Sequence, residues 1–298
     1  MNMQMLGQVA ALGTAFCWTV TSLSFEAAGK RVGSMQVNLI RLVFAFLMFT
    51  VYGAVVHGRA LPLDAGPHVW TWLLLSGLVG FVIGDLFLFQ AFVDVGARTA
   101  MLVYSSVPPM TALLGWIVLG ERLTAVQLLA MALTVAGIMT VTTARVPEDA
   151  IVRPHRFRGI WFAVVGALGQ AGGLVLSRYG APTYDAFGAT QIRTLAGIAG
   201  FVVLFAVTRR WRRVVDALRD RRAQVHIARG AFFGPFLGVS LGLIAAQRAG
   251  TGIAATIIAT VPVLLIPVSI VLFHERVTLR EVAGAILAVG GVALLFLA

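Results

Sequence analysis

The amino-acid sequence predicts an all-α integral membrane protein whose ten transmembrane helices form two inverted five-helix repeats. Of its 298 residues, 59% are hydrophobic and only 12% are charged, and the mean hydropathy is +0.92. This composition leaves too little polar surface to cover a water-soluble globule of that size. The apolar residues fall into runs of about 20, the length of a helix that crosses a bilayer. The second half of the sequence also repeats the first.

Ten apolar runs are separated by short polar or glycine-containing breaks. Long unbroken runs favour helices, which satisfy their own backbone hydrogen bonds, over the alternating ten-residue strands of an outer-membrane barrel. The first run is too long for the apolar core of a cleavable signal peptide, so we expect it to remain as the first helix. The expected helices cover residues 5–27, 33–56, 69–92, 97–119, 124–143, 159–178, 185–207, 227–247, 251–273 and 279–297.

A shift of 154 residues aligns the second half of the chain with the first. Glu121-Arg122 then pairs with Glu275-Arg276, and each acid-base pair ends a long apolar run. The same shift pairs Gly80 with Gly234, Gly84 with Gly238, Val107-Pro108 with Val261-Pro262, Thr124 with Thr278 and Gly137 with Gly291. Because five helices per half is an odd number, the second half must enter the membrane with the opposite orientation. Inverted repeats are typical of secondary transporters, whose halves rock around a site near mid-membrane.

The repeat divides the chain into three parts. Residues 1–144 are the expected first repeat, residues 145–158 a polar linker with two prolines, and residues 159–298 the second repeat. Within each repeat, the GxxxG pair of the third helix should allow close packing against a neighbouring helix. Prolines in the fourth and ninth helices predict kinks, which would serve either as gating hinges or as static bends: Pro108, Pro109, Pro262 and Pro267.

The end of the first half reads "LGERLT" followed by "QLLAMALTVAGIMTV", and the second half echoes it with "HERVT" and "GAILAVGGVALLF". With the positions of Trp18 and Arg41, this pattern resembles the drug/metabolite transporter superfamily, EamA type, over essentially the whole chain. The resemblance implies a ten-helix exporter or exchanger of small metabolites in a bacterial-type cytoplasmic (inner) membrane. Amino-acid exporters are among the members, but the resemblance does not specify the substrate.

The net charge of +11 is concentrated between the expected helices. Three arginines, Arg59, Arg122 and Arg248, lie on one face. The connections on the other face hold Lys30, Arg31, Arg98, Arg145, Arg153, Arg156, Arg158, Arg209, Arg210, Arg212, Arg213, Arg219, Arg221, Arg222 and Arg276. The positive-inside rule places that second face in the cytoplasm and both termini outside, whereas the resemblance implies cytoplasmic termini.

The basic segment 209–222 would suggest nucleic-acid binding in a soluble protein. Between two membrane helices, an interfacial helix that contacts anionic lipid headgroups is the favoured interpretation. We therefore expect anionic lipids at the basic loops and no nucleic-acid partner.

Asp85 is the principal candidate for transport chemistry. A charged side chain near the middle of a membrane helix costs about 2.5–3.5 kcal/mol on insertion scales. Its partner at the shift of 154 is Val239, so the fold does not itself require a carboxylate there. We expect Asp85 either to bind a coupling proton or cation, or to pair with a buried arginine.

Arg41 and Arg193 occupy matching positions of the second and seventh expected helices, at a shift of 152. Their presence in both halves favours a structural role, with a bidentate bond to a ligand carboxylate or phosphate as the alternative. Glu26 lies near the end of the first expected helix, where a charged side chain reaches the interface at low cost. It is a second candidate for coupling.

Polar side chains recur on single faces of the first, fourth and sixth expected helices. Such stripes are typical of helix packing through small and hydroxyl residues, and also of cavity lining. Large aromatic residues with a polar handle, Trp18 and Tyr104, suit a mostly apolar ligand pocket, although either is equally suited to a plain core. The candidate substrate-binding residues are Trp18, Ser22, Tyr104, Ser105, Gln170, Ser177 and Arg41.

The sequence contains no glycine-rich phosphate loop, HExxH or nucleophile elbow, and its five histidines are scattered. The single Cys17 excludes an internal disulfide and a cysteine-based metal site. We expect no enzymatic activity, no metal and no cofactor. An intramembrane enzyme or lipid-processing protein would need a convergent nucleophile, acid and base, and a purely structural protein would leave Asp85 unexplained.

The function predicted from these observations is secondary transport. We expect export of a small metabolite such as an amino acid by alternating access around a central cavity between the repeats, either uncoupled or coupled to protons through Asp85. A monomer contains both repeats and would be sufficient, with an oligomer as the alternative. Glu121-Arg122 and Glu275-Arg276 mark tight turns on opposite membrane faces, with Thr124 and Thr278 as N-caps of the helices that follow.

Overall fold

The computed structural model describes residues 2–95, 103–144, 156–261, 263–264 and 278–297, and every regular element in them is a helix. In chain order these are α1 (Met3–Val32), α2 (Ser34–His57), α3 (Pro67–Gly77), η1 (Leu78–Gly84), α4 (Asp85–Val95), α6 (Val107–Leu119), α7 (Ala125–Thr143), α8 (Arg156–Gly180), α9 (Ala186–Thr208), α10 (Trp211–Arg219), α11 (Arg221–Ala231), η3 (Phe232–Gly238), α12 (Val239–Ala249), α13 (Thr251–Ile258) and α15 (Leu279–Leu297). The predicted all-α fold is confirmed.

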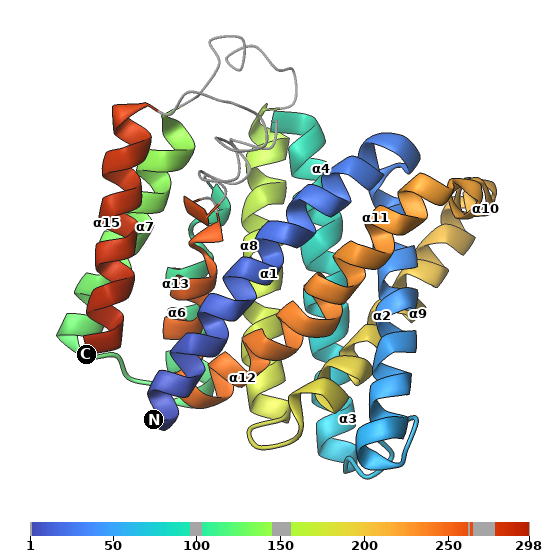
Figure 1. Ribbon diagram of the computed structural model, residues 1–298, viewed down its shortest axis with the longest axis horizontal. Helices are drawn as coiled ribbons and strands as arrows, with labels where there is room; N and C mark the ends of the chain where they lie inside the picture. Colours follow the sequence, from blue (N-terminus) through green and yellow to red (C-terminus); the bar gives the residue numbers. More distant parts are fainter. Residues whose placement is uncertain (1, 96–102, 145–155, 262, 265–277, 298) are drawn as a thin grey trace.

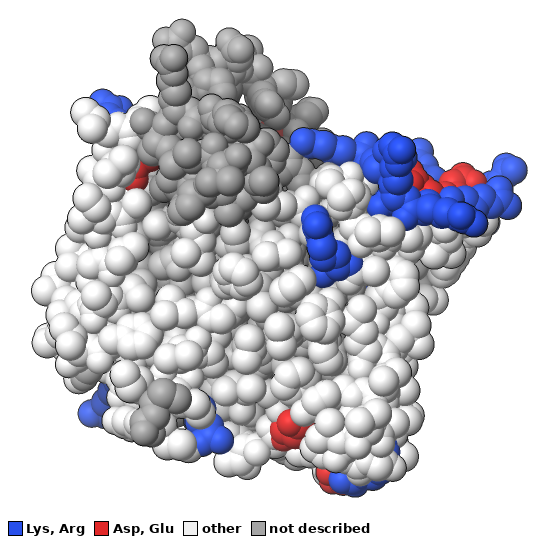
Figure 2. All heavy atoms as spheres, in the orientation of Figure 1, with Lys and Arg blue, Asp and Glu red and all other residues white. Residues whose placement is uncertain are grey.

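Eight described helical segments are long and apolar enough to cross a bilayer, and Val107–Leu119 is a shorter apolar helix. The expected helices 97–119 and 251–273 extend into residues outside the described part, so the count of ten stays a prediction. Figure 2 shows charged side chains gathered at the upper right, over α10, and along the lower edge, with an almost uncharged belt between them. A multi-pass membrane protein accounts for this distribution.

Corresponding helices of the two halves run in opposite directions (Figure 1). In that view α1 and α7 rise, whereas their counterparts α8 and α15 descend; α2 descends and α9 rises. Both termini lie at the lower left. The inverted relation that the odd helix number predicts is therefore present in the described helices.

The third helix of each half contains a π-helical segment, at Leu78–Gly84 and at Phe232–Gly238. The two segments are related by the shift of 154, and the second contains Pro235, which removes a backbone donor. The sequence patterns did not predict them, because a π segment adds one residue to a turn without changing the apolar run. The first segment ends directly before Asp85, and π segments are frequent at functional sites.

The GxxxG pairs pack the third helix of each half against the first helix of the other half. A Cβ added to Gly169 of α8 would lie 2.7 Å from the Cα of Gly84, and one added to Gly173 would lie 2.9 Å from the Cα of Gly80. In the repeat-related crossing, a Cβ on Gly234 of η3 would lie 2.8 Å from Cγ2 of Thr21 of α1. The predicted role of the GxxxG pairs in packing is confirmed.

The fifth helices, α7 and α15, also pack on each other across the two halves. Gly137 of α7 faces the backbone of Gly284 and Ala288, while Gly291 of α15 faces Thr134. The first, third and fifth helices of one half therefore all contact helices of the other half.

Both predicted N-caps are confirmed. Thr124 accepts a hydrogen bond from the Gln127 backbone at 3.2 Å, and the Gln127 side chain accepts one from the Thr124 backbone at 3.0 Å. Thr278 and Glu281 form the same reciprocal capping box, at 3.3 and 2.7 Å. A capping box satisfies two backbone donors that a helix start otherwise leaves unpaired.

Glu121 has a partner that the sequence did not predict. Its carboxylate accepts hydrogen bonds from the backbone N–H of Thr251 at 2.8 Å and from the Thr251 hydroxyl at 2.7 Å. It therefore binds the first residue of α13, in the other half, where the positive end of a helix favours an anion. Glu275-Arg276, the counterpart of Glu121-Arg122, lies outside the described residues.

The predicted kink of the fourth helix is wrong in detail. α6 begins at Val107, so Pro108 and Pro109 lie in its first turn, where no backbone donor is lost. The chain turns immediately before them, at Ser105 and Ser106. The second-half prolines Pro262 and Pro267 lie outside the described residues.

The basic segment 209–222 forms α10 and the start of α11. Val214 and Ala217 are buried, while the arginines of this segment are exposed. Asp220 caps α11 by accepting from the backbone of Ala223 at 3.0 Å and also binds Arg31 at 2.9 Å. These two interactions hold the pKa of the Asp220 carboxyl below its usual value. The segment is thus an amphipathic helix beside the ends of α1 and α2.

Two neighbouring glycines of α8 test the backbone crossing. Gly169→Ala should destabilise the protein by about 1–3 kcal/mol, because the added methyl group overlaps the backbone of Gly84. Gly172→Ala is the matched control, since its Cβ would make an ordinary contact 3.4 Å from Val79. We expect the apparent melting temperature of purified protein to fall only in the first variant. Equal melting temperatures would contradict the close crossing.

Candidate functional site

Asp85 begins α4, directly after the first π segment. Its relative exposure is 7%, in the interior of a helix bundle. Arg41 of α2 forms an ion pair with Asp85 Oδ2, and the Arg41 side chain is also buried. A buried carboxylate is tolerated only with a partner that offsets its lost hydration. Of the two roles predicted for Asp85, pairing with a buried arginine is therefore observed.

Gln170 of α8 supplies the second partner of Asp85. Its side-chain nitrogen donates to Asp85 Oδ1 at 2.8 Å and also contacts the carbonyl oxygen of Gly80 at 3.2 Å. Asp85 thus joins α2 and α4 of the first half to α8 of the second half. Gln170 reaches it because Gly169 brings the two backbones together.

Arg193 of α9 is a second arginine near Asp85. Its guanidinium carbon lies 4.8 Å from the centre of the Phe81 ring, and the side chain is 5% exposed. Asp85 attracts it electrostatically, but no hydrogen bond from Arg193 occurs within the described part of the chain. Arg41 has a comparable aromatic neighbour, with Phe25 at 5.2 Å. The repeat-related arginines therefore differ in one respect: only Arg41 has the carboxylate as a direct partner.

Tyr104 also interacts electrostatically with Asp85. Ser105, next to it in the chain, is buried. Of the candidate residues, Arg41, Gln170 and Tyr104 therefore cluster with Asp85. Ser177 belongs to a different contact, because its hydroxyl bonds to the Gly173 carbonyl and to the Ser76 hydroxyl, each at 2.7 Å.

On α1, Ser22 donates to the Thr19 carbonyl at 2.9 Å, and Trp18 is half-buried. None of the hydrogen bonds between described residues joins either side chain to Asp85. The side chain of Glu26 lies outside the described part, so its coupling role stays a prediction.

The residue that sequence reasoning placed outside the site is Arg193. Its signal was the repeat itself, since it matches Arg41 without a second aspartate to pair with.

The cluster occurs at only one of the two repeat-related crossings. At the shift of 154 Asp85 corresponds to Val239, and at the shift of 152 Gln170 corresponds to Trp18. Both crossings use the glycine pair of the third helix, which meets Gly169 and Gly173 of α8 in one case and Cys17 and Thr21 of α1 in the other. The site therefore lies on one side of the pseudo-twofold axis that relates the halves.

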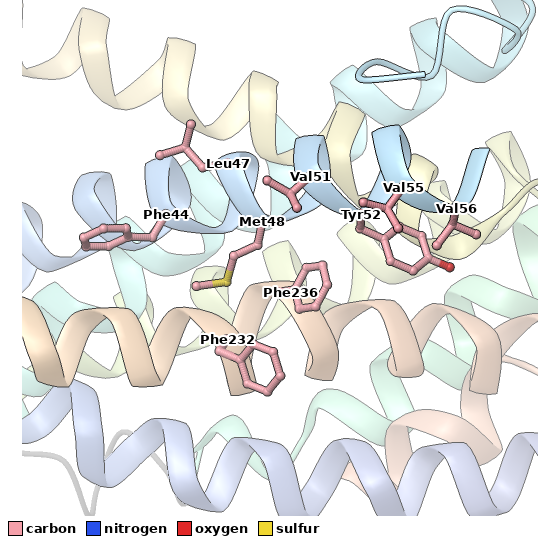
Figure 3. A pocket seen from close by; sticks show the side chains of 9 residues that line it. All are labelled: Phe44, Leu47, Met48, Val51, Tyr52, Val55, Val56, Phe232 and Phe236. Atoms are coloured by element: carbon pink, nitrogen blue, oxygen red, sulfur yellow. The ribbon is translucent and has the colours of Figure 1, made fainter. Parts of the chain in front are cut away.

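An apolar groove of about 490 Å³ lies between α2 and η3 (Figure 3). Met48 and Tyr52 of α2 face Phe236 of η3 across it. The full lining is Phe44, Leu47, Met48, Val51, Tyr52, Val55, Val56, Phe232 and Phe236. The repeat-related contact between α9 and η1 is closed, because a Cβ on Gly200 would come within 2.5 Å of Val82. Bulky side chains of α2 and η3 hold those two helices apart, whereas the small Gly200 lets α9 and η1 approach closely.

A polar clasp joins the α2–α3 and α8–α9 connections at the lower face. Asp64 pairs with Arg59 at 3.2 Å and accepts from the Tyr184 hydroxyl at 3.0 Å. Burial alone would raise the pKa of the Asp64 carboxyl, but the hydrogen bond from Tyr184 and the charge of Arg59 lower it below its usual value. Burial and the neighbouring Asp64 raise the pKa of the Tyr184 phenol. The clasp therefore links two connections through a charged carboxylate.

The fold and the buried cluster define a multi-pass membrane protein with two inverted halves, the architecture of secondary transporters. The sequence model of the EamA-like transporter family matches residues 5–143 and 157–297, so the chain belongs to that family. The resemblance that the repeat motifs indicated is thereby confirmed.

Two curated relatives are similar to part of the chain. The threonine/homoserine exporter RhtA of Escherichia coli K12 is 31% identical over 155 residues, which cover 50% of this chain and 50% of that protein. Its counterpart in Salmonella typhimurium LT2 is 32% identical over 154 residues, 49% of each chain. A solved crystal structure has the same fold, with a TM-score of 0.73, 16% identity, and coverage of 97% of this chain and 95% of that chain. The chain thus spans about half the length of the curated relatives it matches.

Removal of either Arg41 or Asp85 should destabilise the protein, because the two buried side chains form a coupled ion pair. Loss of one partner of such a pair costs about 3–5 kcal/mol, because it leaves an uncompensated charge. We expect Asp85→Asn to lower the apparent melting temperature more than Arg41→Met, since Arg193 can still neutralise Asp85 in the second variant. The double variant should be less destabilised than the sum of the singles. Strict additivity would show that the pair is not coupled.

Proposed function

We propose that this protein exports a small amino acid or a similar metabolite by alternating access. Membership of the EamA-like transporter family supports transport. The two threonine/homoserine exporters that match half of this chain support an amino acid as the substrate class. The proposed functional units are the first repeat (1–144), the linker (145–158) and the second repeat (159–298). The gap between the two stretches matched by the family model supports this division.

The observation that carries the proposal is the Asp85 cluster, which bridges the two halves. Arg41 and Asp85 belong to the first repeat and Gln170 to the second. Alternating access requires the halves to move relative to each other, so a polar contact between them has to break or change partners. A proton on Asp85 would remove the charge that binds Arg41, and the neutral carboxyl would accept a weaker hydrogen bond from Gln170 of the other half. Proton binding and rearrangement would then be linked, because a ligand shifts an equilibrium by its differential affinity for the two states.

The proposed location is a bacterial-type inner membrane, with the basic face in the cytoplasm. The exposed arginines of α10 lie on the opposite side of the bundle from both termini in Figure 1. Anionic headgroups would neutralise them, and the amphipathic α10 suits an interfacial position. A single chain contains both halves and would suffice for transport.

Asp85→Asn should abolish pH-driven accumulation of substrate in proteoliposomes while substrate exchange continues. The amide cannot take up and release a proton, whereas exchange requires only that the loaded protein rearranges. Radiolabelled threonine and homoserine are suitable first substrates, because the two exporters that match half of this chain are named for them. The surviving exchange also reports that the variant is folded.

Val239→Thr is the matched control, because Val239 occupies the equivalent position in the second half. It should keep both accumulation and exchange. Unchanged pH dependence in Asp85→Asn would remove Asp85 from coupling, and absence of flux for every metabolite tested with the wild-type protein would reject export.

A C-terminal reporter that is active only in the cytoplasm tests the orientation. The basic face should lie inside, so a C-terminal fusion should give little signal, whereas a fusion within segment 209–222 should give a strong one. A strong C-terminal signal would reverse the proposed orientation.

A further inference from the structure

The buried cluster around Asp85 contains more positive than negative charge. Arg41, Asp85 and Arg193 have relative exposures of 3, 7 and 5%. The two arginines carry one charge each, and Asp85 carries one charge of the opposite sign. Within the described residues, the cluster therefore has one unit of positive charge in excess. A buried charge without a counter-ion is costly, and it calls for an anion.

The hydrogen bonds of Asp85 assign the excess charge to Arg193. Arg41 occupies Oδ2 of the carboxylate, and Gln170 occupies Oδ1. Arg193 has the Phe81 ring on one side, and its buried Nε has no hydrogen-bond partner among the described residues. Nε of Arg41 is unpaired in the same way, but Arg41 also donates to Asp85 through Nη2. The face of an aromatic ring attracts a cation, but it does not accept the hydrogen bonds that a guanidinium donates in its own plane. Nε of Arg193 is therefore a buried donor that a ligand oxygen would satisfy.

The chemistry of the Arg193 guanidinium favours a carboxylate ligand over a phosphate. A guanidinium presents parallel N–H groups that match the two oxygens of a carboxylate. One excess positive charge is balanced by one carboxylate, whereas a phosphate monoester carries about 1.5 to 2 negative charges. Gly80 lies beside the guanidinium, since a Cβ placed there would contact Nη2 of Arg193 at 3.4 Å.

We propose that Arg193 is the subsite that binds the carboxylate of the transported metabolite. This inference rests on the proposed function and narrows its substrate to compounds with a free carboxylate. It also gives the repeat-related arginines separate tasks: Arg41 holds the internal carboxylate of Asp85, and Arg193 holds the external carboxylate of the substrate. Because both lie beside Asp85, substrate binding at Arg193 and proton binding at Asp85 act on the same electrostatic cluster.

Four probes related to L-threonine separate the carboxylate from the rest of the ligand. They are L-threonine, its amide, the decarboxylated amine 1-amino-2-propanol and the deaminated acid 3-hydroxybutyrate. Binding to purified wild-type protein is measured by the rise in apparent melting temperature with probe concentration. We expect both acids to bind at least tenfold more tightly than the amide and the amine. Lack of any preference for the acids would overturn the inference.

Arg193→Gln should weaken both acids at least tenfold and leave the amide and the amine unchanged. Arg193→Lys keeps a point charge without the paired donors, so it should bind the acids with intermediate affinity. Arg229→Gln removes an exposed arginine of another membrane helix and should behave as wild type. If Arg193→Gln cannot be purified, Phe81→Leu tests the same site, because loss of the ring should weaken only the acids. A retained preference for acids in the Arg193 variant, or an equal loss for all probes, would contradict the assignment.

The same probes distinguish this inference from the proposed function. Flux of the amide or amine through wild-type proteoliposomes without preference for the acids would retain transport and reject the carboxylate subsite. Tight binding of the acids without flux would retain the subsite and reject export.

Discussion

The close backbone crossing between η1–α4 and α8 is the constraint on which the site depends. Gly84 and Gly169 allow the two helices to approach without side chains between them. The next residue of α8, Gln170, then lies within hydrogen-bonding distance of Asp85. A wider crossing would leave that carboxylate oxygen without its donor in a low-dielectric interior, where an unpaired polar group is expensive. Gly84 and Gly169 therefore determine both the close packing of the helices and the hydrogen bonding of Asp85.

The features that the two halves share are those that stabilise the fold, whereas the side chains of the candidate site differ between the halves. The glycine crossings, the π segments and the capping boxes at Thr124 and Thr278 occur in both halves. The carboxylate and the amide of the site occur once, with valine and tryptophan at the related positions. A second buried carboxylate would bring a second desolvation penalty and would cancel the excess positive charge of the cluster. The asymmetry is thus what allows the cluster to attract an anion.

Several of these features were predictable because they rest on local patterns. Apolar runs locate membrane helices, the threonines after the tight turns locate the N-caps at Thr124 and Thr278, and a carboxylate that breaks a repeat singles out Asp85. The bond from Thr251 to Glu121 was not predictable, since it joins residues that are 130 positions apart in different halves. Nor could the sequence tell which arginine pairs with Asp85. Arg41 and Arg193 have similar local sequences, and only the packing of the surrounding helices decides between them.

The packing between the two halves also limits how such a chain could have evolved. The glycine faces of α8 and α7 are covered by helices of the opposite half, so a half-length chain would expose bare backbone to lipid. It could cover those faces only by pairing with a second copy inserted upside down in the same bilayer. A half-length ancestor would therefore have been an antiparallel dimer with two identical sites, and gene fusion would have allowed the two copies to diverge. In this protein that divergence includes the crossing where one half has Asp85 and the other has Val239.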